Sequence, residues 1–304
     1  MNYVRLIAPA KINLVLAVGA KQPGGYHAVD TVMHTLALHD TLVMRRFEED
    51  EGGLAVALSC EGTEGIELDV APEDNLAYKA VFALAAALGR EDNEKIEMSL
   101  VKSIPLQAGL GGGSSDAAAA LLGAAALWDV SAEDPRILEV ACGLGSDVPF
   151  FLQGGCAVLT GRGDQLQRAL EPTKRFCVLV RPEGGVSTAQ AYERFDQAPE
   201  CLDADFVAGL TALSSADQVP VVNNLTAAAK ELLPELAQVE QWVAQAVEEA
   251  PGCQGVLCGS GAAYAVLCDS YDQAVALSVA ASKEGWATRV TSLFPVGATV
   301  VEGH

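Results

Sequence analysis

A glycine-rich segment, Pro105–Ala118, constrains this chain more than any other part of its sequence. Four glycines between positions 109 and 113 allow the backbone to adopt positive φ angles and to approach a ligand closely. An alternating, strand-like stretch over residues 95–102 precedes the segment, and an Ala-rich, helix-like stretch from Ser114 to about Trp128 follows it. The free N–H groups and the dipole at such a helix start attract anions. The order of strand, loop and helix therefore predicts a phosphate site, although a plain glycine turn before a helix would look similar.

The segment matches neither of the two common nucleotide-binding patterns. No Gly-Lys-Ser/Thr follows the glycines, and Ser114 stands where a dinucleotide fingerprint needs its third glycine. Because the loop contains no Lys or Arg, backbone donors must hold the phosphates. Ser115 can in addition offer a hydroxyl to Mg²⁺, as serines of P-loops do.

The charge of the chain excludes several kinds of partner. With 19 Lys and Arg against 40 Asp and Glu, the formal net charge is −21. A chain this acidic is a poor partner for nucleic acid or for an anionic membrane surface. No apolar run is long enough to cross a bilayer, and the N-terminus lacks the apolar core of a signal peptide. We therefore expect a cytoplasmic protein that acts on a small molecule, as a monomer or a homodimer.

Eight cysteines are scattered through mostly apolar surroundings, and none of them forms a Cys-x-x-Cys pair. In a long chain without a secretion signal, this pattern favours buried, reduced thiols over disulfides or a metal site.

The first half of the chain is rich in strand signals. Residues 3–18 are expected to form two extended segments broken at Pro9, and residues 31–46 a strand, a turn and a second strand. A polar loop is expected over residues 61–74, after which Asp74 caps a helix that Gly89 ends. Further elements are a strand over 54–60 and a helix over 131–144.

The second half of the chain has a different pattern. A strand is expected over 177–180, a helix over 225–250 that Pro234 splits or kinks, and a strand–strand–helix–strand arrangement over 256–293. Residues 200–219 resemble a polar linker. We predict an α+β fold of two domains, residues 1–160 and 161–304.

Several motifs beside the glycine loop occur in one order along almost the whole chain. Together they resemble the GHMP kinase superfamily and, within it, the 4-diphosphocytidyl-2-C-methyl-D-erythritol kinases. Small departures are Ser146 and Cys258, at positions where family members often have Ala and Thr. The motifs are Ala8–Leu14, Gly24–His27, Asp40-Thr41, Pro105–Ala118, Leu144–Gly155, Gly185–Thr188, Asn223–Leu225 and Gly259–Ala262.

The resemblance implies a GHMP-kinase-like fold, with the phosphate loop in an N-terminal mixed α/β domain and an α+β domain at the C-terminus. It also implies an activity: transfer of the terminal phosphate of ATP, with Mg²⁺, to the 2-hydroxyl of a cytidine diphosphate derivative of methylerythritol in isoprenoid synthesis. The residues that match the family's ATP loop are Pro105, Leu106, Gln107, Ala108, Gly109, Leu110, Gly111, Gly112, Gly113, Ser114 and Ser115.

Two residues are expected to be catalytic. The resemblance makes Asp147 the base that takes the proton of the hydroxyl, and a carboxylate is ionised at neutral pH. Lys11 lies in an apolar, strand-like context, where a charge is unfavourable without an anionic partner. We expect it to pair with Asp147 and to stabilise developing negative charge.

Other residues are expected to hold the substrate. The resemblance places Asn13 near the reacting hydroxyl, and Tyr26 and His27 on the cytosine, by stacking and by hydrogen bonds to its edge. Thr188 lies in a matching motif, and Tyr192, four residues later, is expected to close the other face of the base. Asn75 either contacts the nucleotide or caps a helix. His34 and His39 are expected to be structural.

Three other functions remain open at this point. A different GHMP kinase would phosphorylate another alcohol, which the Tyr26-His27 motif disfavours. A nucleotide-binding relative without activity is disfavoured because Lys11 and Asp147 are both present. A hydrolase that uses Ser114 or Ser115 would need a His–acid motif beside these serines, and the sequence shows none.

Overall fold

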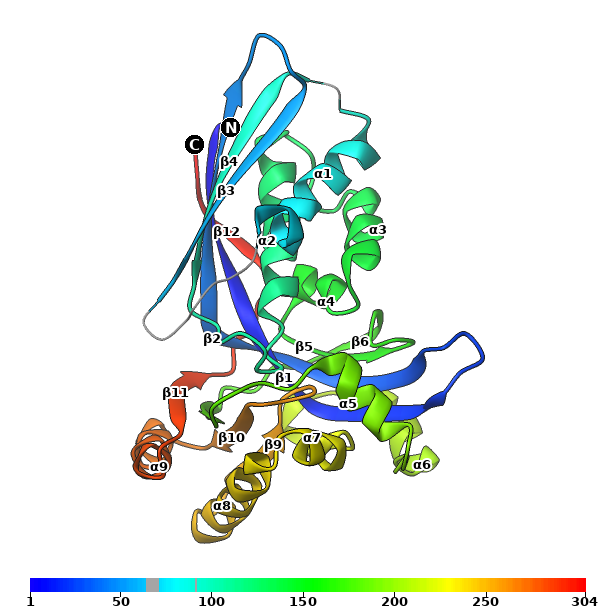
Figure 1. Cartoon of the computed structure of the whole chain (residues 1–304), viewed down its shortest axis with the longest axis vertical. Helices are drawn as coiled ribbons and strands as arrows, with labels where there is room; N and C mark the ends of the chain where they lie inside the picture. Colours follow the sequence, from blue (N-terminus) through cyan, green and yellow to red (C-terminus); the bar gives the residue numbers. More distant parts are fainter. Residues whose placement is uncertain (64–70, 91) are drawn as a thin grey trace.

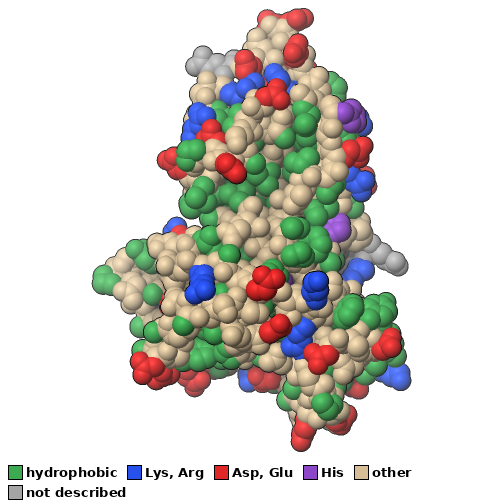
Figure 2. Space-filling model, turned by 180° about the vertical axis from the view of Figure 1, so that it is seen from behind, with side chains coloured by type: hydrophobic (Ala, Val, Ile, Leu, Met, Phe, Trp, Pro, Cys, Tyr) green, Lys and Arg blue, Asp and Glu red, His purple; other side chains and the backbone are tan. Residues whose placement is uncertain are grey.

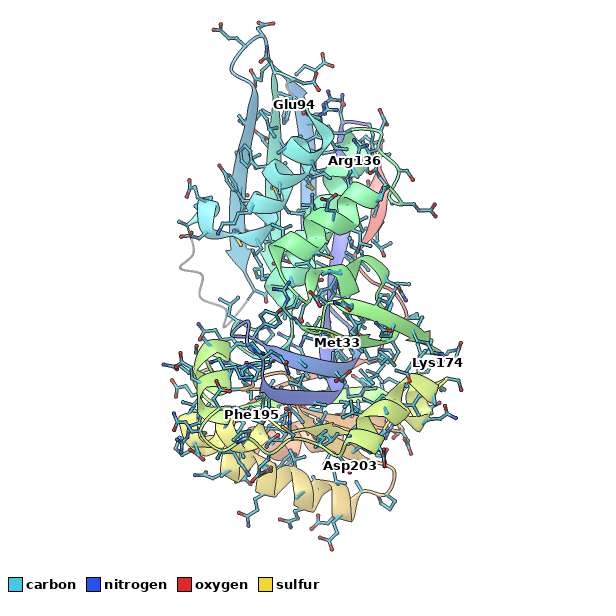
Figure 3. All side chains as sticks on the ribbon, turned by 90° about the vertical axis from the view of Figure 1, so that its right-hand side faces the viewer. Met33, Glu94, Arg136, Lys174, Phe195 and Asp203 are labelled. Carbon is cyan, nitrogen blue, oxygen red and sulfur yellow. The ribbon has the colours of Figure 1, made fainter. Side chains whose placement is uncertain are left out.

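A computed structural model describes residues 1–63, 71–90 and 92–304 of the chain. Figure 1 shows two parts: an upper sheet with helices on one side, and a lower sheet with its own helices. The long strands β1 (Tyr3–Lys21) and β2 (His27–Glu48) run through the upper part and continue over the lower one. In Figure 3, Met33 on β2 lies near the middle of the molecule, where the two parts meet.

The strands β1 and β2 form one antiparallel pair, so the breaks expected at Pro9 and within residues 31–46 were wrong. The register shifts between Pro9 and Lys11 instead, which is how a sheet accommodates a residue without an N–H group. Successive parts of β1 contribute to two different hydrophobic cores: Leu6 to the first, and Ile12 to the second. Burial therefore continues along the strand, and the strand continues with it.

The first sheet has the order β12-β1-β2-β4-β3; in addition β5 pairs with β2, β6 pairs with β5, and the short β8 pairs with β1. The strands β5, β6 and β12 were not expected from the sequence. The bounds are β3 Leu54–Gly62, β4 Glu94–Lys102, β5 Cys156–Thr160, β6 Gln165–Leu170, β8 Val222–Asn223 and β12 Thr299–Gly303.

Helices α1 to α4 lie on one face of this sheet (Figure 1): α2 packs directly on β1 and β2, whereas α3 packs on the neighbouring helices. The Ala and Gly residues of α2 allow close approach: a Cβ atom on Gly123 would lie 2.4 Å from the sulfur of Met44 on β2. The helix α3 begins later than expected, because Asp134 caps it and Pro135 occupies its first turn. The bounds are α1 Leu76–Leu88, α2 Gly112–Leu127, α3 Pro135–Leu144 and α4 Val148–Gln153.

The second sheet has the order β11-β7-β10-β9 and carries helices of the second half of the chain. The expected split at Pro234 is confirmed: α7 ends before it and α8 begins directly after it. The bounds are β7 Phe176–Arg181, β9 Gln254–Leu257, β10 Tyr264–Cys268, β11 Ala287–Ser292, α5 Thr188–Phe195, α6 Ala204–Gly209, α7 Thr226–Leu232, α8 Glu235–Glu249 and α9 Tyr271–Lys283.

Residues 200–219 are more ordered than the linker expected there, since α6 and two short 3₁₀ turns, Leu210–Ala212 and Ala216–Gln218, lie within them. A third 3₁₀ turn, Pro72–Asp74, precedes α1. Most of the loop expected over 61–74 lies outside the described residues.

The fold is mixed α/β with two sheets, as the sequence indicated. The division into domains at residue 160 stays a prediction, and two strands of the second half, β8 and β12, pair with β1. No helix in the described part of the chain is long and apolar enough to cross a membrane. On the face shown in Figure 2, acidic and basic side chains are interspersed.

The eight cysteines are free, as expected, but burial was predicted too broadly: Cys142 and Cys201 are exposed.

Candidate active site

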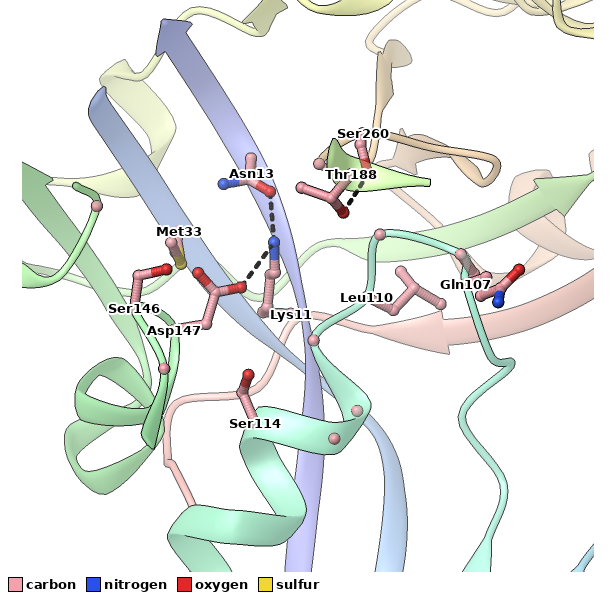
Figure 4. A pocket seen from close by; sticks show the side chains of 18 of the residues that line it. Lys11, Asn13, Met33, Gln107, Leu110, Ser114, Ser146, Asp147, Thr188 and Ser260 are labelled. Carbon is pink, nitrogen blue, oxygen red and sulfur yellow. Dashed lines mark hydrogen bonds and ion pairs between the residues drawn. The ribbon is translucent and has the colours of Figure 1, made fainter. Parts of the chain in front are cut away.

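A cavity of about 450 Å³ lies where β1, β2, the glycine-rich loop, the start of α4 and the start of α5 meet. Figure 4 shows the side chains that line it. Of the sequence-predicted residues, those lining the cavity are Lys11, Asn13, Pro105, Leu106, Gln107, Ala108, Gly109, Leu110, Gly111, Gly112, Gly113, Ser114, Asp147, Thr188 and Tyr192. The structure thus brings most of them to one place.

The glycine-rich loop connects β4 to α2 and is held by backbone contacts on two sides. The N–H of Lys11 donates to the carbonyl of Leu110 at 2.9 Å, and the N–H of Ala262 donates to the carbonyl of Gln107 at 3.2 Å. Gly109 has φ +75°, and a Cβ atom there would lie 1.8 Å from the carbonyl oxygen of Cys258. Only glycine therefore fits at this position.

The start of α2 supplies free backbone donors to the cavity. Gly111 occupies the N-cap position with φ +71° and offers no side chain to the N–H groups of the first turn. Ser114 lines the cavity, and its hydroxyl points toward Asp147 in Figure 4. These features suit an anion at the helix start.

Ser115 is placed differently from what was expected. Its side chain is fully buried, its hydroxyl has no hydrogen-bond partner among the described residues, and it does not line the cavity. Because the period of a helix turns neighbouring residues to different faces, Ser114 and not Ser115 faces the cavity. The expected contact of Ser115 with Mg²⁺ therefore has no support in this geometry.

Lys11 lies in the wall of the cavity between Asp147 and Asn13. Its Nζ atom lies 3.3 Å from Oδ2 of Asp147 and donates to Oδ1 of Asn13 at 2.7 Å (Figure 4). Asn13 in turn donates to the hydroxyl of Thr31 at 2.9 Å. Lys11 is only 4% exposed, so its charge is balanced locally by Asp147.

Asp147 occupies the N-cap position of α4, but its side chain makes no capping hydrogen bond. The carboxylate instead faces Lys11 and the cavity, with about a quarter of its side chain accessible. It thus has the contact with solvent and ligand that a base needs.

Thr188 and Tyr192 lie on α5 at another side of the cavity. The hydroxyl groups of Thr188 and Ser260 are 2.9 Å apart (Figure 4). Burial, helped by the charge of Asp147, raises the pKa of Tyr192 to about 12, so this phenol stays protonated near neutrality.

Tyr26 and His27 do not line the cavity. Tyr26 is 55% exposed and lies over Gly24, where a Cβ atom would be 2.7 Å from the ring. His27 is buried and packs edge-on against Tyr192, with 5.0 Å between the ring centroids. His27 is thus connected to the cavity through Tyr192, and Tyr26 lies apart in this state.

The remaining polar residues discussed from sequence have structural contacts. Asn75, not Asp74, caps α1, and its Oδ1 accepts from the N–H of Ala77 at 2.9 Å. Burial lowers the pKa of His34 to about 4, and its Nδ1 lies 2.9 Å from the carbonyl of Thr35. Nδ1 of His39 lies 2.7 Å from the carbonyl of Ala37.

Sequence reasoning missed a buried ionic cluster under the glycine-rich loop. Nζ of Lys102 contacts the carboxylates of Asp40 and Asp116, and all three side chains are buried. Asp40 also accepts from the N–H groups of Ser103 and Ile104, at the start of the loop. The cluster ties both ends of the loop to β2. The only signal for it was the Asp40-Thr41 motif.

Three further residues line the cavity although the sequence analysis did not name them as site residues. Gly259 and Ser260, from the matched Gly259–Ala262 motif, line it beside Gly109, and Arg162 lines it from the turn between β5 and β6. A second cavity of about 350 Å³ adjoins the first and shares Leu76, Lys102, Leu106 and Gly113 with it. No group of three or more His, Cys, Asp or Glu side chains in the described ranges is arranged to hold a metal ion.

Comparison with known proteins agrees with this geometry. The sequence profile described as "GHMP kinases N terminal domain" matches residues 75–155. The chain is 37% identical to the 4-diphosphocytidyl-2-C-methyl-D-erythritol kinase of Desulfitobacterium hafniense over 90% of each chain. It is also 37% identical to the kinase of the same name from Nocardia farcinica, over 97% of this chain and 95% of that one.

Solved structures show the same fold. A crystal structure of 4-(cytidine 5′-diphospho)-2C-methyl-D-erythritol kinase superposes with a TM-score of 0.70 at 29% identity, covering 95% of this chain and 98% of that one. A homoserine kinase from Cytophaga hutchinsonii superposes with a TM-score of 0.72 at 19% identity, covering 99% and 98%, which shows a common fold. The identity over nearly the full length and the common fold lead to one conclusion: the chain belongs to the 4-diphosphocytidyl-2-C-methyl-D-erythritol kinase family of GHMP kinases.

Proposed function

We propose that this chain transfers the γ-phosphoryl group of ATP to the 2-hydroxyl of 4-(cytidine 5′-diphospho)-2-C-methyl-D-erythritol, with Lys11 and Asp147 as its catalytic residues. Membership of the family assigns the chain this kinase activity in the non-mevalonate isoprenoid pathway, with ATP as co-substrate. The observation that carries the catalytic assignment is the contact of 3.3 Å between Lys11 and Asp147 in a cavity that the glycine-rich loop also lines.

The glycine-rich loop and the start of α2 hold the triphosphate in this proposal. Without a cation in the loop, the N–H groups of the first turn of α2 and its dipole supply the favourable interactions. The second cavity continues from the loop past Leu106 and Gly113, and its walls include apolar side chains such as Leu58 and Leu76. It suits a flat base, and we place the adenine there.

Asp147 is the general base. As the hydroxyl oxygen attacks the γ-phosphorus, its proton passes to the carboxylate, and the bond between this phosphorus and the bridging oxygen of ADP breaks. Lys11 stabilises the negative charge that develops between the attacking oxygen and the phosphoryl group. Asn13 holds the Lys11 ammonium in place by its hydrogen bond of 2.7 Å.

The oxygen donors at the cavity are compatible with Mg²⁺, which usually retains water and binds phosphates together with one or two protein oxygens. Ser114 lines the cavity and would hold the ion beside the phosphates, in place of the buried Ser115. Bound there, Mg²⁺ would neutralise part of the charge on the phosphates.

The acceptor substrate extends along β2 in this proposal. His27, with Tyr192 and Tyr26, receives the cytosine at one end, and Met33 lies beside Asp147 at the other (Figure 4). Between them, the N–H of Val29 donates to the carbonyl of Gly161, which brings the neighbouring Arg162 to the cavity. The guanidinium of Arg162 would contact the diphosphate, since it is half-exposed and its contact with Asp164 is 3.2 Å.

An ATP-consumption assay with the cytidyl-diphosphate alcohol, against free methylerythritol phosphate, tests this function. Turnover with the first compound only is expected, and turnover with neither, or with mevalonate or homoserine instead, would contradict the acceptor. The domain division at residue 160, a cytoplasmic location and a monomeric or homodimeric state stay predictions.

A further inference from the structure

We infer that Asp196 is a positioning residue that sets the base specificity of the kinase: it holds His27 in the tautomer with hydrogen on Nε2, so that Nδ1 accepts a hydrogen bond from the amino group of cytosine. The inference rests on the proposed role of His27 at the cytosine. It adds a residue, Asp196, that follows the last residue of α5 and does not itself line the cavity.

The contact between the two residues is short and well defined. Oδ1 of Asp196 lies 2.6 Å from Nε2 of His27, and Oδ2 of the same carboxylate accepts from Nζ of Lys21 at 2.9 Å. Each carboxylate oxygen therefore has one partner, and the two partners come from the ends of β1 and β2.

Asp196 is ionised in this arrangement. The hydrogen bond from Lys21 and then the one from His27 hold the pKa of the carboxyl below its usual value. An ionised carboxylate only accepts hydrogen bonds, so Nε2 of His27 carries the hydrogen between them. In a neutral imidazole, Nδ1 is then an acceptor.

The ring of His27 is also fixed by packing. It is 6% exposed, and its neighbours Tyr192 and Phe195 contact it edge-on with centroid distances of 5.0 and 6.2 Å. All three side chains around it, Tyr192, Phe195 and Asp196, come from one end of α5, which lies in the lower part of the molecule in Figure 3. In the part of the chain that the structure describes, the ring makes its hydrogen bond through Nε2 and none through Nδ1.

The chemistry of the two pyrimidines makes this tautomer selective. Cytosine carries an amino group at C4, which donates, whereas uracil carries a carbonyl oxygen there, which accepts. An acceptor at Nδ1 of His27 therefore binds the amino group of cytosine and is repelled by the carbonyl oxygen of uracil. If Nδ1 carried the hydrogen instead, the preference would reverse.

Three variants of Asp196 separate this role from a purely structural one. Asp196→Ala removes the acceptor and leaves both tautomers accessible. Asp196→Glu keeps a carboxylate. Asp196→Asn has a single side-chain oxygen. Because the Lys21 ammonium can only donate, that oxygen accepts from Lys21. The amide nitrogen then donates to Nε2 of His27, so the ring hydrogen moves to Nδ1. The matched control is Glu193→Gln, which removes an exposed acidic charge from the same helix.

The experiment compares kcat/KM for the cytidine substrate with kcat/KM for its uridine analogue. We expect the ratio to fall about tenfold in Asp196→Ala, the effect of one neutral hydrogen bond, and to fall further in Asp196→Asn. The ratio should be largely retained in Asp196→Glu and unchanged in Glu193→Gln. The losses should appear in KM for the cytidine substrate, with kcat nearly constant, because the base lies away from the reacting atoms.

The variant His27→Ala distinguishes failure of this inference from failure of the proposed base site. Suppose that His27→Ala loses the preference for cytidine while Asp196→Ala and Asp196→Asn keep the wild-type ratio. Asp196 then does not act through His27, so the inference about Asp196 is overturned and the proposed base site stands. If His27→Ala itself leaves KM and the ratio unchanged, the base does not bind there, and both proposals are overturned.

Nitrogen NMR of the imidazole gives a readout that does not depend on activity. With [¹⁵N]histidine, the resonances assigned to His27 by comparison with His27→Ala should show a protonated Nε2 in the wild type and a protonated Nδ1 in Asp196→Asn. A protonated Nδ1 in the wild type would overturn the inference.

Discussion

Nζ of Lys11 lies 3.3 Å from Oδ2 of Asp147, although the two residues come from a strand of the sheet and from the start of a helix that covers it. The lysine is almost fully buried, whereas the carboxylate remains accessible from the cavity. The pair thus places one buried cation and one accessible carboxylate beside the same part of the cavity. This combination suits proton removal with charge stabilisation, and it makes separate predictions for the two charges.

Replacement of the base is expected to affect turnover and not binding. Asp147→Asn keeps the shape of the side chain but removes its basicity, so kcat should fall by a factor of about 10²–10⁴, the usual contribution of a general base. Steady-state kinetics measures kcat, and calorimetry measures the Kd for ATP and for the cytidyl substrate, which should change little.

The matched control for this prediction is Asp134→Asn. Asp134 also occupies an N-cap position, directly before Pro135. Its side chain, however, caps α3 and pairs with Arg136 on the surface. Asn is an equally good cap, so this variant should retain activity. A normal kcat in Asp147→Asn would reject Asp147 as the base.

Two glycines of the loop should respond very differently to the same added methyl group. Gly109→Ala requires a non-glycine residue at φ +75° and places Cβ 1.8 Å from the carbonyl of Cys258, whereas a Cβ on Gly113 meets nothing closer than 4.0 Å. The left-handed conformation alone costs about 1–2 kcal/mol, and relief of the clash must displace the loop. Gly109→Ala should therefore lower the thermal midpoint and weaken ATP binding.

Gly113→Ala is the control for the thermal midpoint, because it adds the same methyl group in the first turn of α2 without a clash inside the protein. Thermal unfolding of the two variants, side by side, and ATP titration of Gly109→Ala against wild type provide the measurements. Equal effects of the two substitutions would show that the loop does not have the conformation described.

The buried carboxyl of Asp116 predicts a pH dependence of stability. Burial is the main cause that raises the pKa of Asp116 to about 7 from its ordinary value of 3.8, against the opposing effect of Lys102. Between these two values the folded state binds more protons than the unfolded chain, so the contribution to the free energy of unfolding falls as pH rises. Above about pH 7 it is lost.

Asp116→Asn removes this titration, so the variant should become more stable relative to wild type as pH rises from about 4 to about 7. Chemical denaturation at several pH values measures the difference. Asp134→Asn again serves as the control, since Arg136 lowers the pKa of Asp134 to about 2 and this group does not titrate in that window. A difference that does not vary with pH would contradict the raised pKa.

The fold was predictable where local signals dominate. The glycine-rich loop lies between a strand and a helix as expected, and Pro234 separates α7 from α8. The breaks predicted within β1 and β2 were wrong because the two strands cross from one hydrophobic core to the next, and contacts on both sides hold them together despite Pro9. The strand β12 was missed because it is stabilised by pairing with β1, at the other end of the sequence.

The site was predictable where motifs lie in one chain segment. Lys11, Asp147 and the glycine-rich loop were recognised from such motifs, and the structure brings them together. Arg162 and Asp196 were not recognised, because each acquires its neighbours only through folding: a turn placed beside β2, and a helix end placed against His27. A single charged residue outside a motif cannot be recognised as a site residue from one sequence.

Replacement of Tyr26 tests whether the cytosine stacks on this ring. Because its ring is 55% exposed and lies over Gly24, stacking on the base requires it to move on binding. Tyr26→Ala should raise KM for the cytidyl substrate by about 5- to 100-fold, the range for loss of one aromatic stack, and leave kcat nearly unchanged. Tyr271→Ala is the control, since Tyr271 is similarly exposed, at 56%, but packs on Phe176 in the second sheet. An unchanged KM in Tyr26→Ala would remove the stacking role.

Arg162 should contribute to substrate binding through its charge. Three cations line the cavity in the described residues: Lys11 is balanced by Asp147, Lys102 by two buried carboxylates, and Arg162 only by a partly exposed contact with Asp164. Arg162 is therefore the cation best placed to receive the diphosphate of the substrate. Arg162→Ala should raise KM for the cytidyl substrate about tenfold, with little change in KM for ATP, because hydrogen bonds to charged groups contribute about 1.5–3 kcal/mol and exposure reduces this.

The control for Arg162 lies on the same hairpin. Arg168 on β6 is exposed and its guanidinium contacts the carbonyl of Thr211, away from the cavity. Arg168→Ala removes the same charge from the protein and should leave both KM values unchanged. Raising the salt concentration should increase KM for the cytidyl substrate in wild type and in Arg168→Ala more than in Arg162→Ala, because screening acts on an interaction that the last variant has already lost. Equal salt dependence of all three proteins would show that Arg162 does not meet the diphosphate.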